Sequence, residues 1–410
     1  MPTTLVLSRQ PLASRPLQEW VDDPADSVVL FTTEQAVAGA EDELAKYFPR
    51  HHLVADYHSW TAEAAAEQAA RAFGVDRIAC TSEHDVLRAA RLRARLGLPG
   101  QQPASAAAYR DKVLMKQLAE QAGLAVPAFA AVDDPLDLLD FVDAVGFPVV
   151  VKPRSGCGSV GVHVLRDREG LEHFLAGEPE SALPFLPGLW MAESFVTGEL
   201  CHVDGVMADG RIVHAWPGQY SSGVAEYLAA DTFISSVLLA AEDPRRAVLM
   251  AFAAELIAAL PAAPDPIAFH LEAWICPDGR VVLCEIASRA GGALIAETYE
   301  RAFGVHLARE GLRLQCGSEP TIGGQPAELE RPNGWLMIPP GFGRFTPPAE
   351  RCPVPGVDLT VQLAAGAVGH GVGKASNTAA RALVSGATAD EVRRRIDEVV
   401  AWWQRNASWS

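Results

Sequence analysis

The chain has 410 residues, of which 49% are hydrophobic and 21% charged, and its formal net charge is −17. This length suffices for two to four structural units with a substantial core, and the composition is that of a soluble globular protein. The negative charge argues against nonspecific binding to nucleic acid or to an anionic membrane.

Targeting signals are not expected either. The first residues lack a basic region followed by a long apolar run, and no uncharged apolar stretch is long enough to span a bilayer. The seven cysteines show no CxxC and no zinc spacing. They predict reduced thiols in a cytoplasmic protein.

The first hundred residues alternate strand-like with helix-like segments. Residues 4–8, 27–32 and 77–81 are strand-like, and the alanine-rich stretches 61–73 and 83–95 are helix-like. This alternation predicts a small open α/β unit with a parallel sheet. No GxGxxG follows the first strand, so dinucleotide binding is unsupported.

A turn-rich stretch, residues 98–105, predicts a linker after this unit. Residues 111–123 are then expected to form a helix that ends at Gly123, with a proline beyond it. A helix at 134–145 and a buried strand at 147–152 follow.

The segment 270–285 consists of two apolar runs separated by Asp278-Gly279, a strong signal for a two-residue hairpin turn. With the turn centred there, positions whose numbers sum to 557 face each other, so Glu272 lies opposite Glu285. The same rule gives the other cross-strand pairs as Cys276 with Val281 and Trp274 with Leu283.

Two carboxylates placed opposite each other have Cβ atoms about 5 Å apart. They repel, and within apolar strands they also lose hydration. A hard divalent cation with oxygen ligands is the natural counter-charge for Glu272 and Glu285. A shared proton, or side chains splayed into water, is the alternative. His270 shares the strand face of Glu272 and is either near the reacting groups or a satisfied strand histidine.

A glycine-rich loop follows the strand that ends at Lys152. Gly156, Gly158 and Gly161 allow backbone N–H groups to approach an anion, and Lys152 adds a point charge for a phosphate oxygen. An ordinary glycine-rich hairpin is the alternative. Farther along, residues 216–223 are aromatic and rich in hydroxyls, which suits a substrate-facing loop, although turn chemistry explains them equally well.

These motifs, in this order, resemble those of the ATP-grasp superfamily. They are Asp111-Lys112 on a helix, Lys152-Pro before the glycine-rich loop, Glu193-Ser-Phe-Val-Thr-Gly198, the hairpin with Glu272, and Glu285-Ile-Ala-Ser-Arg289-Ala-Gly-Gly. The resemblance covers the chain up to about residue 340. The segment that starts at Gly334 and the C-terminal extension look like the L-amino-acid ligase branch, which includes carboxylate–amine ligases of natural-product pathways.

The resemblance implies an α/β fold, with α+β character in the central and C-terminal parts. Residues 1–107 would form an N-terminal open α/β domain. Residues 108–190 would form the central lid domain with a glycine-rich flap. Residues 191–410 would form a C-terminal mixed-sheet domain with the catalytic hairpin and a C-terminal extension.

It also implies site roles. Glu272 and Glu285 would bind Mg²⁺, with Mn²⁺ as an alternative, and Arg289 would stabilise charge on the acyl phosphate or tetrahedral intermediate. Lys152 and His270 are the other candidate catalytic residues. The residues implied in ATP binding are Lys112, Lys152, Ser155, Gly156, Gly158, Ser159, Gly161, Glu193, Ser194, Phe195, Val196 and Glu199.

The chain departs from the family pattern at two places. Ala287 stands where an asparagine ligand is usual, so a second magnesium ion would rely on water, the carboxylates and ATP. The ribose-binding acid is ambiguous between Glu199 and Asp204, with Leu200 as the residue that occupies the usual glutamate position in one alignment. Glu199 is slightly favoured.

The implied activity is an ATP-dependent carboxylate–amine ligation through an acyl phosphate, with ADP and phosphate released. The partners would be a small-molecule carboxylate, such as an amino acid, and an amine. One alternative is a ligase whose acceptor is a thiol or a carrier-protein-bound group, and another is a non-catalytic ATP-binding module. Neither nucleic acid nor a membrane is an expected partner, and a homodimer is open.

Overall fold

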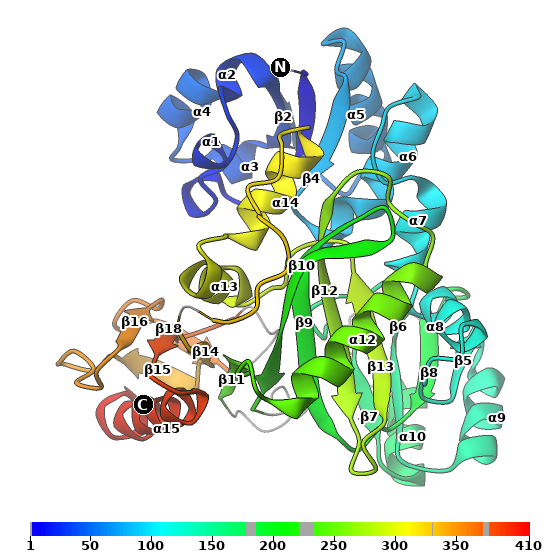
Figure 1. The fold of residues 1–410 in the computed structure, drawn as a ribbon, viewed down its shortest axis with the longest axis vertical. Coiled ribbons are helices and arrows are strands. Elements are labelled where there is room, and N and C mark those ends of the chain that lie inside the picture. Colours follow the sequence, from blue (N-terminus) through cyan, green and yellow to red (C-terminus); the bar gives the residue numbers. More distant parts are fainter. Residues whose placement is uncertain (1, 178–185, 222–232, 330, 372–376) are drawn as a thin grey trace.

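A computed structural model describes residues 2–177, 186–221, 233–329, 331–371 and 377–410. Its described strands form four sheets, and helices cover them (Figure 1). No helix among these residues is both long and apolar enough to cross a membrane.

The N-terminal sheet is parallel, as predicted, with the strand order β3-β2-β1-β4. Leu5 and Leu7 face one layer of helices and Val6 faces the other, because side chains alternate across a strand. The prediction missed β3, whose two histidines interrupt the apolar pattern. The strands are β1 (Thr4–Leu7), β2 (Val28–Thr33), β3 (His51–Val54) and β4 (Arg77–Cys80).

Helices cover both faces of this sheet. The predicted helices at 61–73 and 83–95 are confirmed as α5 (Trp60–Ala72) and as η2 (Glu83–Asp85) followed by α6 (Val86–Leu96). Short helices pack on the opposite face. They are η1 (Leu12–Ser14), α1 (Leu17–Trp20), α2 (Pro24–Ser27), α3 (Glu34–Val37) and α4 (Glu41–Tyr47).

The predicted linker at 98–105 is shorter than expected, because α7 (Pro103–Ala108) begins within it. Pro103 occupies the first helical turn, where its missing N–H costs nothing. The next helix is α8 (Lys112–Gln121), whose N-cap Asp111 accepts hydrogen bonds from the backbone N–H groups of Val113 and Leu114.

A second sheet, with the order β5-β8-β6-β7, is antiparallel and has α9 (Pro135–Val145) and α10 (Arg168–Leu175) packed against it. Its strand β6 confirms the predicted buried strand. The strands are β5 (Phe129–Val132), β6 (Val149–Pro153), β7 (His163–Leu165) and β8 (Trp190–Ser194). The domain boundaries at residues 107 and 190 stay a proposal.

The largest sheet has eight described strands in the order β13-β12-β9-β10-β11-β14-β18-β16. All its described pairings are antiparallel, which corrects the expected mixed sheet. Hairpins account for part of this, because strands joined by a tight turn run in opposite directions. The strands are β9 (Glu199–Ala208), β10 (Arg211–Tyr220), β11 (Ile234–Leu238), β12 (Ile267–Ile275), β13 (Val281–Ala287), β14 (Asn333–Ile338), β16 (Val357–Val361) and β18 (Ala380–Ser385).

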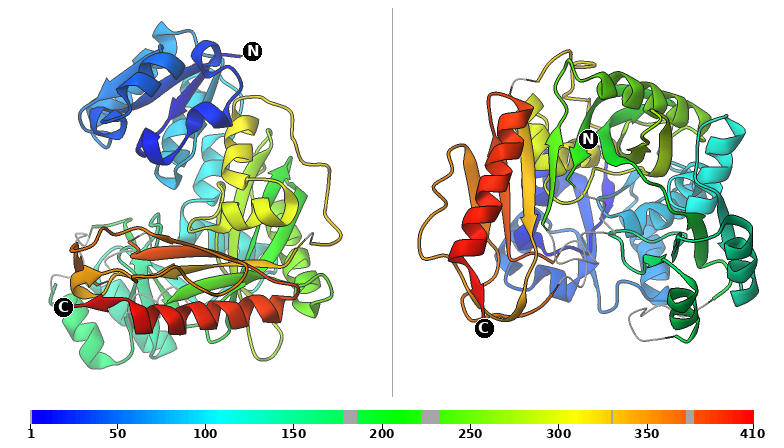
Figure 2. Two further views of the ribbon diagram at one scale, coloured as in Figure 1. Left: turned by 90° about the vertical axis from the view of Figure 1, so that its left-hand side faces the viewer. Right: turned by 90° about the horizontal axis from the view of Figure 1, so that it is seen from below.

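Helices pack on both faces of this sheet. The helix α12 (Pro244–Ala259) covers one face, and α13 (Ile295–Phe303) and α14 (Leu307–Gln315) pack against the other. The helix α15 (Ala389–Asn406) lies along the C-terminal strands (Figure 2). A small third antiparallel sheet completes this end, with β15 (Phe342–Thr346), β17 (Val368–His370) and β19 (Ser408–Trp409).

Candidate active site

A cleft of about 220 Å³ lies between the four-stranded sheet β5-β8-β6-β7 and the strands β12 and β13 of the large sheet. Its polar lining contains most of the residues that the sequence singled out: Lys112, Lys152, Gly156, Gly158, Ser159, Glu193, Ser194, Glu272 and Glu285. The predicted Phe195 and Val196 line it as well. The sequence prediction named Leu200 only as an alternative at the ribose-binding position, and it gave no cleft role to the other apolar side chains that complete the wall: Val150, Val160, Val162 and Trp274.

Glu272 and Glu285 lie directly opposite each other, as predicted, but by a different route. The turn has three residues, because Cys276 pairs with Arg280 and Gly279 adopts a φ of 85°. This shifts the register by one, so that Trp274 faces Val282 rather than Leu283, and Ile275 rather than Cys276 faces Val281.

A β-bulge restores the register at the glutamates. Glu272 faces Glu285 while Ala273 faces Leu283, so Cys284 is the extra residue on β13. Cys284 and Glu285 both line the cleft although they are neighbours in a strand. The bulge therefore turns three side chains toward one space: Glu272, Cys284 and Glu285.

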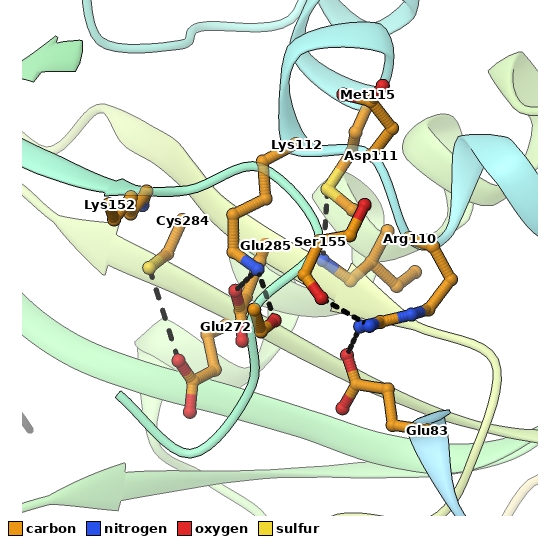
Figure 3. A network of polar contacts seen from close by, with 12 residues as sticks. Glu83, Arg110, Asp111, Lys112, Met115, Lys152, Ser155, Glu272, Cys284 and Glu285 are labelled. Carbon is orange, nitrogen blue, oxygen red and sulfur yellow. Dashed lines mark hydrogen bonds and ion pairs between the residues drawn. The ribbon is translucent and has the colours of Figure 1, made fainter. Parts of the chain in front are cut away.

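Lys112 provides the counter-charge for one glutamate. Its Nζ lies 2.9 Å from Oε2 of Glu285 and donates a hydrogen bond to the carbonyl oxygen of Gly156 at 2.9 Å (Figure 3). Burial alone would raise the pKa of Glu285, but Lys112 and Lys152 outweigh it and lower the pKa to about 2. Glu285 is therefore ionised at neutral pH.

Lys152 and Glu193 form a buried ion pair, with Nζ 2.5 Å from Oε1. A third lysine, Lys116, lies 3.3 Å from the other carboxylate oxygen of Glu193. Burial would raise the pKa of Glu193, but the two lysines lower it. The sequence prediction missed Lys116, although a lysine four residues after Lys112 on a helix shares its face.

Glu272 contacts one side chain of its own strand, His270 on β12, and one of β10, Tyr220. The Tyr220 hydroxyl donates a 3.0 Å hydrogen bond to its Oε1, and Nε2 of His270 lies 3.3 Å from the same oxygen. His270 is buried and contacts Asp204 through its other nitrogen. It lies outside the cleft lining, so its chemical role would be exerted through Glu272.

Arg289 also lies outside the cleft lining. It donates hydrogen bonds to Glu83, a buried residue of η2 that also accepts from Arg110. Arg110 donates in turn to the carbonyl oxygen of Ser155, in the glycine-rich loop (Figure 3). The sequence carried no signal for Glu83, because its two arginine partners lie 27 and 206 positions away.

The favoured ribose-binding residue is not in the cleft. Glu199 points to Arg245 of α12, with Oε2 2.7 Å from the guanidinium, whereas Leu200, the next residue on β9, lines the cleft. Strand alternation explains this, because neighbouring side chains face opposite sides. Asp204 is buried between two histidines and does not line the cleft either.

Ser155 and Gly161 belong to the glycine-rich loop but do not line the cleft, whereas Gly156, Gly158 and Ser159 do, and a role of Ser155 and Gly161 in ATP binding stays a prediction. One other expectation needs correction. The expected substrate-facing loop at 216–223 is a strand up to Tyr220, the last residue of β10, and its buried Trp216 and Tyr220 belong to the sheet. Residues 222 and 223 lie outside the described part of the chain.

The donor set fits a hard divalent cation. Two carboxylates face one cleft from adjacent strands, and oxygen is the ligand that Mg²⁺ prefers. Ala287, buried on β13 opposite His270, adds no ligand. Lysines and glycine-rich backbone at the same cleft suit a polyanion that arrives with the cation.

The chain is similar to a family of ATP-binding domains and to two ligases. Residues 111–204 match the family of ATP-binding domains described for the carbamoyl-phosphate synthase L chain. The chain is 27% identical over 294 residues to an L-arginine-specific L-amino acid ligase of Bacillus subtilis, covering 70% of this chain and 69% of the relative. It is also 27% identical over 251 residues to a D-alanine–D-alanine ligase of a Synechococcus strain, covering 56% of this chain and 76% of the relative.

Among solved structures, an L-amino acid ligase from Bacillus licheniformis is similar over the whole chain. The TM-score is 0.72, and the match covers 100% of this chain and 99% of the other, at 17% sequence identity. At this identity the likeness establishes the fold, and it confirms the predicted fold class.

Proposed function

We propose that this chain, which belongs to the ATP-grasp superfamily, is a carboxylate–amine ligase that activates an acid with ATP and joins it to an amine. The proposed substrates are an amino acid or a related carboxylate and a small amine, and the products are an amide or peptide, ADP and phosphate. The two ligases named above support this substrate class, because both names describe the joining of amino acids.

One observation carries the proposal. A single cleft brings together Lys112, Lys152, Glu272 and Glu285, from three separate parts of the chain. In the structure Lys112 pairs with Glu285 and Lys152 pairs with Glu193, whereas Glu272 contacts Tyr220 and His270. A metal–triphosphate complex offers both charges at once, so it can replace these internal partners without leaving an unpaired charge.

The reaction needs positioning and charge neutralisation more than a covalent nucleophile. A carboxylate oxygen of the acid attacks the γ-phosphorus, and the bond to the ADP oxygen breaks. The amine nitrogen then attacks the acyl carbon, phosphate departs, and the amine loses a proton. Magnesium, when bound by Glu272 and Glu285, supplies charge neutralisation on the phosphate oxygens.

This chain's own groups do the rest. Lys112 and Lys152 bind phosphate oxygens. The loop around Gly158 and Ser159 covers the triphosphate and excludes water from the reactive acyl phosphate. Glu193 and residues 194–196, beside the apolar wall, bind the base. Arg289 donates hydrogen bonds to Glu83 of η2. Its proposed role is to neutralise charge on the acyl group.

The experiment is amino-acid-dependent ADP release, combined with the mass of the product. Glu285→Gln should abolish metal-dependent ADP release, because it removes the charge that the cation requires. Glu300→Gln is the matched control, since Glu300 is a half-exposed surface residue paired with Arg309. Full turnover by the Glu285 variant, or ADP release without a condensed product across a broad panel of acids and amines, would overturn the proposal.

One observation favours a second candidate function. Ala287 removes a usual metal ligand, which suits a non-catalytic nucleotide-binding module. Binding of ATP without turnover in Mg²⁺ or Mn²⁺ would identify it. A mass shift on a carrier protein, with no product from free amines, would instead identify a carrier-bound acceptor.

The proposal also covers the cellular compartment and the oligomeric state. All seven cysteines are free, which supports a reducing compartment such as the cytoplasm. A homodimer is kept as a proposal, which light scattering of the purified protein tests directly.

A further inference from the structure

A buried chain of polar groups joins residues of β11, β9 and β12 of the large sheet and ends at Glu272. It passes β10, which lies between β9 and β11. It begins at the Ser236 hydroxyl on β11, which lies 2.6 Å from Nε2 of His202 on β9. Nδ1 of His202 lies 2.5 Å from Oδ2 of Asp204. The other oxygen of Asp204 lies 2.8 Å from Nδ1 of His270 on β12, and Nε2 of His270 reaches Glu272.

We call Ser236, His202, Asp204 and His270 the relay. All four are buried, which is costly for polar groups unless they are hydrogen-bonded. Each ring nitrogen of His270 faces a carboxylate oxygen, one from Asp204 and one from Glu272. His270 therefore bridges the two carboxylates, with one ring nitrogen toward each.

Two glycines leave room for the relay. A Cβ at Gly218 would lie 2.5 Å from Nε2 of His202, and a Cβ at Gly291 would lie 2.6 Å from Oδ1 of Asp204. Gly291 is two residues after Arg289, so the loop that carries the proposed catalytic arginine packs directly on the relay. The absence of a side chain at Gly218 and Gly291 thus leaves the space that His202 and Asp204 occupy.

His202, Asp204 and His270 have ligand atoms within 4.8 Å of one another, and in the structure these atoms contact one another, Ser236 and Glu272. A histidine binds a metal through an unprotonated nitrogen. Both nitrogens of His270 are taken by carboxylates, and those of His202 by Asp204 and Ser236.

We propose that the relay and Tyr220 are positioning residues that hold the carboxylate of Glu272 in the orientation that binds the divalent cation. Both arms meet at Oε1 of Glu272: the Tyr220 hydroxyl at 3.0 Å and the relay at 3.3 Å. The other oxygen of Glu272, Oε2, faces Cys284, whose sulfur lies 4.0 Å away and lines the cleft. Outer partners of this kind orient the ligands that touch a metal and tune their affinity.

The inference rests on the proposed function, and its test measures metal binding rather than ligation. Mn²⁺ binding is measured by electron paramagnetic resonance in the presence of ADP, for wild type and for Asp204→Asn. The asparagine keeps the shape of the aspartate and removes the charge that holds His270. We expect Mn²⁺ to bind roughly 10- to 100-fold more weakly, with ADP affinity affected much less.

His214→Asn is the matched control, because His214 is a buried histidine of the same sheet that contacts Tyr299 and lies outside the relay. It should lose stability and keep its Mn²⁺ affinity. Tyr220→Phe is the second variant if Asp204→Asn does not fold, and it should weaken Mn²⁺ binding by about tenfold because it removes the other arm.

The outcomes separate the two ideas. Equal Mn²⁺ affinities of wild type, Asp204→Asn and Tyr220→Phe would overturn the positioning role and leave the proposed function intact. Equal weakening in His214→Asn would show a general loss of stability and would also overturn it. A wild-type protein that binds ADP but no Mn²⁺ would overturn the metal site of the proposed function, and the positioning role with it.

Discussion

Lys116 shows how a single buried charge joins three parts of the cleft. Its side chain is completely buried, and its Nζ contacts Glu193 and donates hydrogen bonds to the backbone oxygens of Leu283 and Cys284 at 3.2 and 2.8 Å. Burial lowers its pKa and Glu193 opposes that change. The lysine thus links helix α8 to Glu193, which we propose to bind the base, and to the bulge of β13.

Lys116→Met should therefore destabilise the protein by about 3 kcal/mol, because it leaves Glu193 with one cation instead of two and removes a donor from two buried carbonyls. The free energy of unfolding in urea measures this loss. Lys46→Met is the control: Lys46 is exposed on α4, and its removal should change stability by less than about 0.5 kcal/mol. Equal stabilities of the two variants would contradict the role assigned to Lys116.

At the scale of the element, the β12–β13 hairpin explains why the prediction for the glutamate pair was right although its reasoning was incomplete. Asp278-Gly279 marked the turn, but the turn has three residues and the bulge at Cys284 compensates for the extra one. A one-residue slip would have turned Glu285 away from Glu272. The bulge was invisible in the sequence, because nothing in Val-Val-Leu-Cys-Glu distinguishes it from a regular strand.

Gly279→Ala should destabilise the hairpin by about 1 kcal/mol, since Gly279 has a φ of 85° and a side chain disfavours that conformation. The midpoint of urea unfolding measures the change. Gly323→Ala is the control, because a Cβ there meets nothing within 4 Å and its φ is not in the left-handed region. A control variant as destabilised as Gly279→Ala would show that backbone strain is not the cause.

At the scale of the whole molecule, partly buried polar contacts join the N-terminal part of the chain to the segments that flank strands β12 and β13 of the large sheet. Glu83 accepts from Arg289, and Arg77 pairs with Asp265 at 2.9 Å. Another buried polar contact fixes helix α13 on the large sheet, where Nδ1 of His214 lies 2.5 Å from the Tyr299 hydroxyl. Such contacts make global stability depend on pH.

Burial lowers the pKa of His214 to about 4, from an ordinary value of 6.5. The unfolded chain therefore binds more protons than the folded one between pH 4 and 6.5, and the free energy of unfolding rises with pH across that window. His214→Asn should flatten this rise, measured by urea unfolding at half-unit pH steps. An unchanged slope would show that His214 does not titrate as described.

Local sequence patterns were enough to predict many of the secondary-structure elements and much of the cleft lining. Alternation and periodicity predicted the parallel N-terminal sheet, α5, α6 and α9, because each of these elements buries one side of a simple repeat. Glycine spacing and the lysine beside it predicted the loop at the cleft, and ordered motifs indicated the fold and most of the cleft lining. These features depend on residues that are close in the chain.

Features that depend on distant residues emerged from the folded structure alone. Glu83 reaches Arg289, Lys116 reaches Cys284, and His202 joins Asp204 to Ser236 only when strands and helices from separate parts of the chain are packed together. The ion pair of Glu199 with Arg245 of α12 is a further contact between residues that are distant in the chain. The sequence specifies the charge of each side chain, but burial and long-range packing determine which other charged groups it contacts.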